Sequence, residues 1–165
     1  MSETNHVIVI GAGAAGMLAA IAAAREGAAV ELWEQNEKPG KKLFITGKGR
    51  CNVTNACDME ELLGSVVSNS KFLYSSFYGF TNQDMMDLLE QAGLRLKVER
   101  GNRVFPVSDH SSDVIRALAD GMRDLGVQVR LNTEVDSLIL TDGCIRGVRI
   151  RGGREEIPAD AVVVA

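Results

Sequence analysis

The sequence feature that most constrains the fold is a glycine-rich turn between two apolar segments. His6–Ile10 is a short β-branched run typical of a buried strand, and Ala14–Glu26 is an alanine-rich stretch with high helix propensity. The turn follows the pattern G-x-G-x-x-G and consists of Gly11, Ala12, Gly13, Ala14, Ala15 and Gly16. A second strand, predicted over Val30–Glu34, completes a βαβ unit over residues 1–34 with parallel strands.

Each residue type in this unit has a physical reason. Gly11 permits the tight turn, Gly13 lets a pyrophosphate approach the backbone, and Gly16 lets the helix pack against the sheet. The free N–H groups and the positive end of the helix dipole attract phosphate. Glu34 ends the second strand, where a carboxylate can bind ribose hydroxyls. We predict that the turn, Glu34 and Gln35 bind the ADP portion of a dinucleotide. A glycine-rich turn in an unrelated α/β protein remains the alternative.

The pattern downstream predicts an α/β fold, a Rossmann-like parallel sheet with a small antiparallel β meander inserted at 133–158. Turns are predicted at Asp142-Gly143 and Gly152-Gly153, and an apolar strand at Ala161–Ala165 resumes the sheet. We also predict a helix over 81–91 with Thr81 as N-cap, and one over 113–125 capped by Ser111 or Ser112. Burial is predicted for Met85, Leu88, Leu89, Val114, Leu118, Met122 and Leu125.

The segment 35–58 is long, rich in Gly, Lys, Asn and Thr, and without sustained periodicity, which favours a functional loop. Three residues of buried type, Leu43, Phe44 and Ile45, argue against plain disorder. Glycines allow close backbone approach, Arg50 can pair with phosphate or with a reduced flavin, and asparagine side chains donate and accept hydrogen bonds. An ordinary surface turn is the alternative.

Two strings in the chain, 41–55 and 103–108, closely resemble the signature of a bacterial family of NAD(P)/FAD-dependent oxidoreductases, the aminoacetone oxidase-like flavoproteins. The resemblance covers all 165 residues and implies an FAD-binding domain. The string from Gly11 to Glu34, with Ala20 and Gly27, separately resembles the signature of FAD proteins of the glutathione-reductase type, most of which NAD-binding domains share. In that family the loop lies along FAD, and a backbone group at the start of the meander meets the adenine. The implied cofactor contacts beyond the βαβ unit are Lys42, Gly47, Gly49, Arg50, Cys51, Asn52, Asn55 and Val135. Lys48 departs from the family, where a glycine is expected.

We therefore expect the chain to be the N-terminal part of an FAD-dependent oxidoreductase that transfers hydride or electrons between FAD and a small organic substrate or NAD(P)H. The family continues beyond a strand like 161–165 into a substrate domain, so we expect this piece alone to be inactive, and no catalytic acid or base is assigned. One alternative is a flavin disulfide reductase using Cys51 and Cys57, although their spacing is C-x5-C rather than C-x4-C. Another is a dinucleotide-binding module without chemistry.

Composition restricts partners and compartment. The net charge is −4 with no basic block, which excludes an evident nucleic-acid surface. The uncharged segment 7–24 approaches the length of a membrane span, but its glycines interrupt it where a strand should become a helix. Three cysteines indicate neither a disulfide framework nor a complete zinc site, so we expect a cytoplasmic protein without a metal. Oligomeric state is left open.

Overall fold

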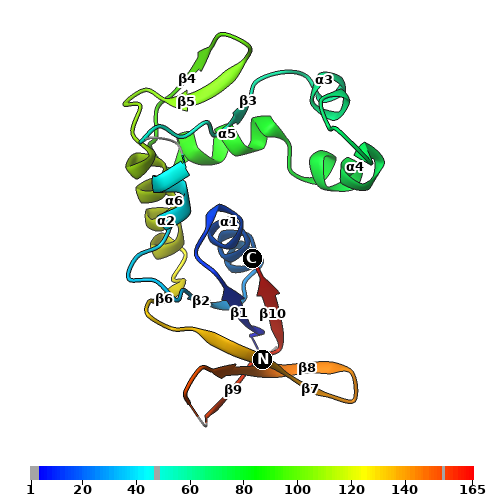
Figure 1. Cartoon of the computed structure of the whole chain (residues 1–165), viewed down its shortest axis with the longest axis vertical. Helices are drawn as coiled ribbons and strands as arrows, with labels where there is room; N and C mark the ends of the chain where they lie inside the picture. The colour runs from blue at the N-terminus through cyan, green and yellow to red at the C-terminus, as the bar shows by residue number, and fades with distance from the viewer. Residues whose placement is uncertain (1–3, 47–48, 154) are drawn as a thin grey trace. The chain divides into compact units, whose positions relative to one another are not determined.

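A parallel sheet forms the centre of the first of two compact units into which the chain divides (Figure 1). The computed structural model describes residues 4–46, 49–153 and 155–165. Unit 1 comprises Met1–Leu43 with Leu118–Ala165, and unit 2 comprises Phe44–Ala117. The chain passes from unit 1 to unit 2 within helix α2 (Lys41–Thr46) and returns to unit 1 within helix α6 (Ser111–Asp124).

The sheet of unit 1 has the strand order β10-β1-β2-β6, and all its pairs are parallel. Its strands are β1 (His6–Ile10), β2 (Ala29–Trp33), β6 (Gln128–Arg130) and β10 (Ala161–Val164). The β-branched side chains of Val7, Ile8 and Val9 are buried, as a central parallel strand requires. This confirms the predicted Rossmann-like sheet.

Helix α1 (Ala14–Arg25) makes the crossover from β1 to β2. Its small and flexible residues on one side, including Met17 and Ala20, have no exposed surface. The helix ends at Arg25 with Glu26 as its C-cap, and the next residue, Gly27, has a φ of 86°, a left-handed conformation that glycine adopts without strain. The strand, helix and stop predicted from the sequence are therefore confirmed.

The antiparallel meander of unit 1 consists of β7 (Val135–Thr141), β8 (Cys144–Ile150) and β9 (Glu156–Pro158). Asp142 and Gly143 both have positive φ, which is the geometry of a two-residue hairpin turn. Val148 lies in one apolar cluster with Ile8 and Trp33 of the parallel sheet, so the meander and the sheet share a core. The insertion predicted from the sequence is confirmed.

Unit 2 contains an antiparallel sheet of order β3-β5-β4 and helices α3, α4 and α5. Their bounds are β3 (Thr54–Asn55), α3 (Met59–Gly64), α4 (Ser70–Gly79), α5 (Asn82–Gln91), β4 (Leu96–Glu99) and β5 (Arg103–Pro106). The Thr81 hydroxyl accepts the N–H of Asp84, whose carboxylate accepts the N–H of Thr81. This capping box confirms the predicted start of α5.

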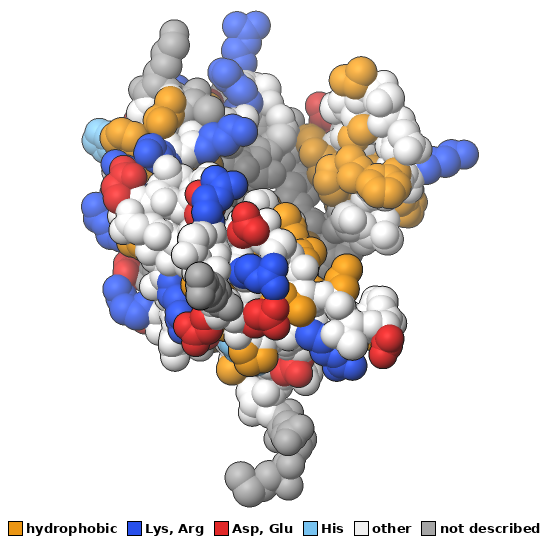
Figure 2. Space-filling view, turned by 60° about the horizontal axis from the view of Figure 1, so that its bottom comes forward, with side chains coloured by type: hydrophobic (Ala, Val, Ile, Leu, Met, Phe, Trp, Pro, Cys, Tyr) orange, Lys and Arg blue, Asp and Glu red, His pale blue; other side chains and the backbone are white. Residues whose placement is uncertain are grey.

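Helix α4 carries an exposed aromatic surface. Hydrophobic side chains, coloured orange, gather at the right of Figure 2, the side on which Figure 1 draws α3 and α4. Phe72 is 77% exposed, and Tyr74 and Tyr78 stack with ring centroids 4.6 Å apart. Neither α3 nor α4 was predicted, because their apolar residues bury little surface and show no clear helical stripe.

Several local predictions are corrected. The segment 35–58, predicted as a loop without sustained periodicity, contains α2 and β3. Phe44 and Ile45 are exposed by 49% and 65%, although their residue type suggested burial. Leu125, which directly follows α6, is 39% exposed, although burial was predicted for it. Helix α6 begins at Ser111 itself, so neither predicted serine precedes the helix as a cap.

Candidate dinucleotide site

The glycine turn joins β1 to α1 through contacts that leave no room for side chains at two of its three glycines. Gly11 has a φ of 99°, and a Cβ built there would lie 2.6 Å from the carbonyl oxygen of Ala165. A Cβ on Gly16 would collide with the Gly11 carbonyl oxygen, so the close approach predicted for Gly16 is to the turn itself. Gly11 N–H donates to the Trp33 carbonyl at 2.7 Å, which ties the turn to β2.

Gly13 is different, because a Cβ built there would meet nothing within 4 Å among the residues that the structure describes. It is the N-cap of α1, with no side-chain capping bond and no acidic residue in the first helical turn. Ala14 and Ala15 are exposed beside it. The first N–H groups of a helix need partners, and an anion supplies them. The space and the donors therefore fit a phosphate group.

Glu34 fixes the turn from the end of β2. Its Oε2 accepts the N–H of Ala12 at 2.8 Å, and its Oε1 accepts the N–H and the Nδ2 of Asn36 at 2.8 and 2.6 Å. The residue is only 8% exposed. Burial raises the pKa of Glu34, but the hydrogen bonds from Ala12 and Asn36 outweigh it, so the pKa lies below its ordinary value. Glu34 is therefore a buried carboxylate held in its charged form.

A pocket of about 200 Å³ opens beside Glu34 at the carboxyl ends of β1 and β2. Its lining contains four residues predicted to bind the cofactor, which are Gly11, Glu34, Gln35 and Val135. Ligands of open parallel sheets bind at this end of the strands. Thr133 and Glu134 also line the pocket and were missed by sequence reasoning. Their position directly before Val135 is the signal that could have found them.

In unit 2 the segment 49–55 is held against strand β5. Val53 N–H donates to the Val104 carbonyl at 2.9 Å, and Ala56 N–H donates to the Asn102 carbonyl at 2.7 Å. The carbonyl of Gly49 accepts the N–H of Ser111 at 2.7 Å. Gly49 has a φ of 88°, which explains a glycine at this position.

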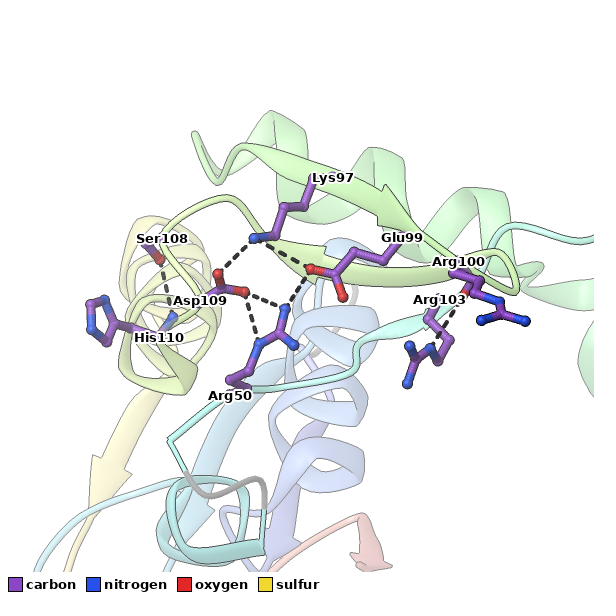
Figure 3. Close-up of polar contacts among 8 residues, drawn as sticks. All are labelled: Arg50, Lys97, Glu99, Arg100, Arg103, Ser108, Asp109 and His110. Atoms are coloured by element: carbon purple, nitrogen blue, oxygen red, sulfur yellow. Dashed lines mark hydrogen bonds and ion pairs between the residues drawn. The ribbon is translucent and has the colours of Figure 1, made fainter.

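Arg50 lies in an ionic cluster of unit 2 rather than in open solvent (Figure 3). Its Nε and Nη2 donate to Oδ1 of Asp109 at 2.9 and 2.5 Å, and Nη2 also donates to Oε1 of Glu99 at 2.6 Å. Its guanidinium lies 4.1 Å from the centre of the buried Phe105 ring. None of these partners was predicted, because they lie far from Arg50 in the sequence.

The two asparagines of the segment also bond within unit 2. Asn55 donates through Nδ2 to the Gly101 carbonyl and accepts the Cys57 N–H through Oδ1, both at 2.9 Å. With its amide turned so that nitrogen faces two carbonyls, Asn52 donates to Val104 and Thr54 at 3.1 Å. These side chains thus stabilise the segment, and their contact with a cofactor stays a prediction.

The remaining predicted residues differ in their surroundings. Cys51 is buried and Cys57 half-buried, and both are free thiols. Burial raises the pKa of each, so neither has the lowered pKa of a reactive thiolate. Lys42 lies exposed on α2. Gly47 and Lys48 lie outside the described residues.

Within residues 4–46, 49–153 and 155–165, no helix is sufficiently long and apolar to cross a membrane. No three side chains of His, Cys, Asp or Glu in the same ranges lie together so that they could hold a metal ion.

The parallel sheet, the glycine turn and the pocket define a Rossmann-type dinucleotide-binding domain. More particularly, the chain belongs to the HI0933-like protein Rossmann domain family, whose model matches residues 5–165. This is a family of FAD-dependent oxidoreductases, which confirms the resemblance noted in the sequence.

Relatives with known names agree with this assignment. The chain is 36% identical to the 3-dehydro-bile acid delta(4,6)-reductase of Clostridium scindens, over 98% of the chain and 38% of the relative. It is 32% identical to the ribosomal RNA dihydrouridine synthase of Escherichia coli, over 92% of the chain and 40% of the relative. A flavocytochrome c3 fumarate reductase structure matches with a TM-score of 0.67 and 26% identity, covering 99% of this chain and 33% of that one. The chain thus spans about two-fifths of the length of these curated relatives.

Proposed function

We propose that this protein is an FAD-dependent oxidoreductase and that unit 1 binds the ADP half of the cofactor. The observation that carries the proposal is the pocket beside Glu34. It combines Gly11, a buried ionised carboxylate and Val135 at the carboxyl ends of parallel strands. Family membership and the flavocytochrome relative support FAD as the dinucleotide.

The residues of unit 1 fit the chemistry of ADP. The space at Gly13 and the N-terminal amides of α1 suit the pyrophosphate, because a Cβ at this point would fill that space. The carboxylate of Glu34 can accept ribose hydroxyls at its remaining lone pairs. Val135 and Glu134 border the pocket where the adenine would lie. When bound, FAD supplies the hydride or electron transfer, and the protein supplies binding, orientation and electrostatics.

For the substrate we propose a small organic molecule, with NAD(P)H as a further candidate electron donor. The reductase from Clostridium scindens and the fumarate reductase act on small molecules by their names, and both match over nearly the whole chain. The dihydrouridine synthase of Escherichia coli makes an RNA substrate the second candidate. The net charge of −4 favours the first, since RNA binding relies on basic surface.

The disulfide-reductase alternative is less well supported by the chemistry of its cysteines. Such an enzyme needs an accessible thiol with a lowered pKa, whereas burial raises the pKa of Cys51. We propose a cytoplasmic protein, because three free thiols fit a reducing compartment.

The cofactor proposal is tested by titrating the purified chain separately with FAD, ADP and NAD+ and by competing FAD with ADP. We expect FAD and ADP to compete for one site, and NAD+ to bind more weakly than FAD. A preference for NAD+, or no competition by ADP, would refute the proposal. For the pocket variant Glu34→Ala, Glu155→Gln is a suitable control, because Glu155 is an exposed carboxylate of unit 1 that does not line the pocket.

A further inference from the structure

The Arg50 cluster is a closed ionic network of two cations and two anions. Lys97 Nζ bonds Oδ2 of Asp109 at 2.6 Å and lies 3.4 Å from Oε1 of Glu99, so the two carboxylates share both cations. In Figure 3 Lys97 and Glu99 come from β4, Asp109 follows β5, and Arg50 comes from the segment before β3. The formal charges of these four groups sum to zero, so each cation is neutralised by the carboxylates of the network itself.

The backbone conformation and the hydrogen bonds of Asp109 suit its position in the network. Its φ of 60° is left-handed, a conformation that aspartate and asparagine tolerate better than most residues. Its N–H donates to the Pro106 carbonyl at 3.0 Å. Hydrogen bonds from Lys97 and Arg50 hold the pKa of Asp109 below its ordinary value. The neighbouring His110 ring points away from this carboxylate in Figure 3, so the two residues do not form a catalytic dyad.

Arg50 connects this network to the segment that the sequence predicts to contact the cofactor. The Nε–Nη2 edge of its guanidinium is occupied by Asp109, and the plane lies against Phe105. Two nitrogens bonded to one carboxylate orient the planar guanidinium more closely than a single contact would. Immediately after Arg50 the backbone bonds strand β5 through Val53 and then pairs with it as β3.

We propose that Arg50 is a positioning residue: Asp109 and Glu99 hold it, and through it they fix the backbone of residues 49–55 for the cofactor. Its guanidinium does not itself bind the charged groups of FAD. This inference rests on the proposed FAD function. It assigns roles to Asp109 and Glu99, which the sequence pattern did not single out.

The two possible roles of Arg50, direct binding of a phosphate and positioning of the segment, predict different effects of Asp109→Asn on FAD affinity. If Arg50 bound a phosphate directly, removing the carboxylate would free its charge, and FAD affinity would rise or stay unchanged. If Arg50 is a positioning residue, the same change releases the segment, and FAD affinity falls. Asparagine also tolerates a positive φ, so this variant removes the charge without adding backbone strain.

Arg50→Lys gives a second test. Lysine keeps the positive charge, which would preserve a direct phosphate contact, but it lacks the planar fork that binds Asp109 through two nitrogens. If Arg50 is a positioning residue, Arg50→Lys should weaken FAD binding as much as Arg50→Gln, which removes the charge as well. Arg116→Gln is the matched control, because Arg116 is an exposed arginine of unit 2 that pairs with Asp113 within α6 rather than with a carboxylate of the network.

The experiment measures FAD and ADP affinity together with amide hydrogen exchange at Val53 and Ala56, in the full chain. We expect Arg50→Gln, Arg50→Lys and Asp109→Asn each to weaken FAD binding roughly threefold or more, with the double variant Arg50→Gln, Asp109→Asn no weaker than the worse single variant. Exchange at both amides should quicken roughly tenfold in the same variants. ADP affinity should stay within about twofold of wild type in every variant, since ADP binding belongs to unit 1.

The outcomes separate this inference from the proposed function. Wild-type protein that binds no FAD refutes the function, while the exchange data still report whether the network fixes the segment. Unchanged or tighter FAD binding by Asp109→Asn overturns the positioning role, as does normal FAD binding by Arg50→Lys. Faster exchange with unchanged FAD affinity also overturns it, because the network would then order the segment without any effect on the cofactor.

Discussion

Glu34 of unit 1 and Arg50 of unit 2 are both charged residues predicted to contact one cofactor, yet their surroundings differ in kind. The three hydrogen bonds of the Glu34 carboxylate come from Ala12 and Asn36, and the residue is 8% exposed. The Arg50 side chain is 42% exposed and bonds carboxylates 49 and 59 residues away. The first site is assembled by a βαβ motif, whereas the second depends on a hairpin that only folding brings into place.

The largest effect is expected from Gly16→Ala in unit 1. The added Cβ would overlap the Gly11 carbonyl oxygen, and a backbone atom cannot rotate away as a side chain can. We expect the free energy of unfolding, measured by urea titration, to fall by roughly 3 kcal/mol. Gly13→Ala is the control, because its Cβ meets open space, so it should lose only the preference of an N-cap for glycine over alanine, about 1 kcal/mol or less. Equal stability of the two variants would contradict this account of the turn.

Glu34→Ala comes next and tests whether unit 1 binds ADP by itself. The change removes charge-assisted interactions worth roughly 1.5–3 kcal/mol. Affinity for FAD and for ADP should then fall together, by about ten- to a hundredfold. Isothermal titration of both ligands measures this. A loss confined to FAD would place Glu34 outside the ADP site, and an unchanged dissociation constant would make it a structural residue alone.

The pH dependence of stability sharpens the contrast further. The pKa of Glu34 is lowered in the folded chain, so its contribution to stability is present above the ordinary value of 4.5 and is lost as pH falls through the lowered pKa. Wild type should therefore lose unfolding free energy more steeply than Glu34→Gln on acidification from pH 5. Parallel curves for the two proteins would show that Glu34 titrates alike when folded and unfolded.

The smallest effect is expected for the cysteines of unit 2. In the whole enzyme proposed above, Cys51→Ser with Cys57→Ser should leave FAD affinity and flavin reduction by the natural donor within about twofold of wild type, because raised thiol pKa values disfavour redox chemistry. Alkylation should reach exposed Cys144 first and buried Cys51 last. Loss of turnover with FAD still bound would favour a disulfide reductase instead.

Sequence alone determined the parts of this protein whose causes are local. The β-branched run, the glycines and the alanine-rich helix lie next to one another in the chain, so β1, α1 and β2 could be predicted from propensity and turn chemistry. The Thr81 cap and the Asp142-Gly143 turn are likewise set within four residues. The Rossmann fold and the pocket residues Gly11 and Glu34 follow from these signals, whereas Thr133 and Glu134 of the same pocket were missed.

Only the tertiary structure decided the partners of residues that meet across long loops. Nothing near Arg50 in the sequence indicates that Glu99 and Asp109 would occupy its guanidinium. The exposure of Phe44 and the helices α3 and α4 also escaped prediction, because burial depends on neighbours that periodicity does not specify. Hydrogen bonds within a turn are encoded by adjacent residues, whereas an ionic network between distant strands exists only after the chain has folded.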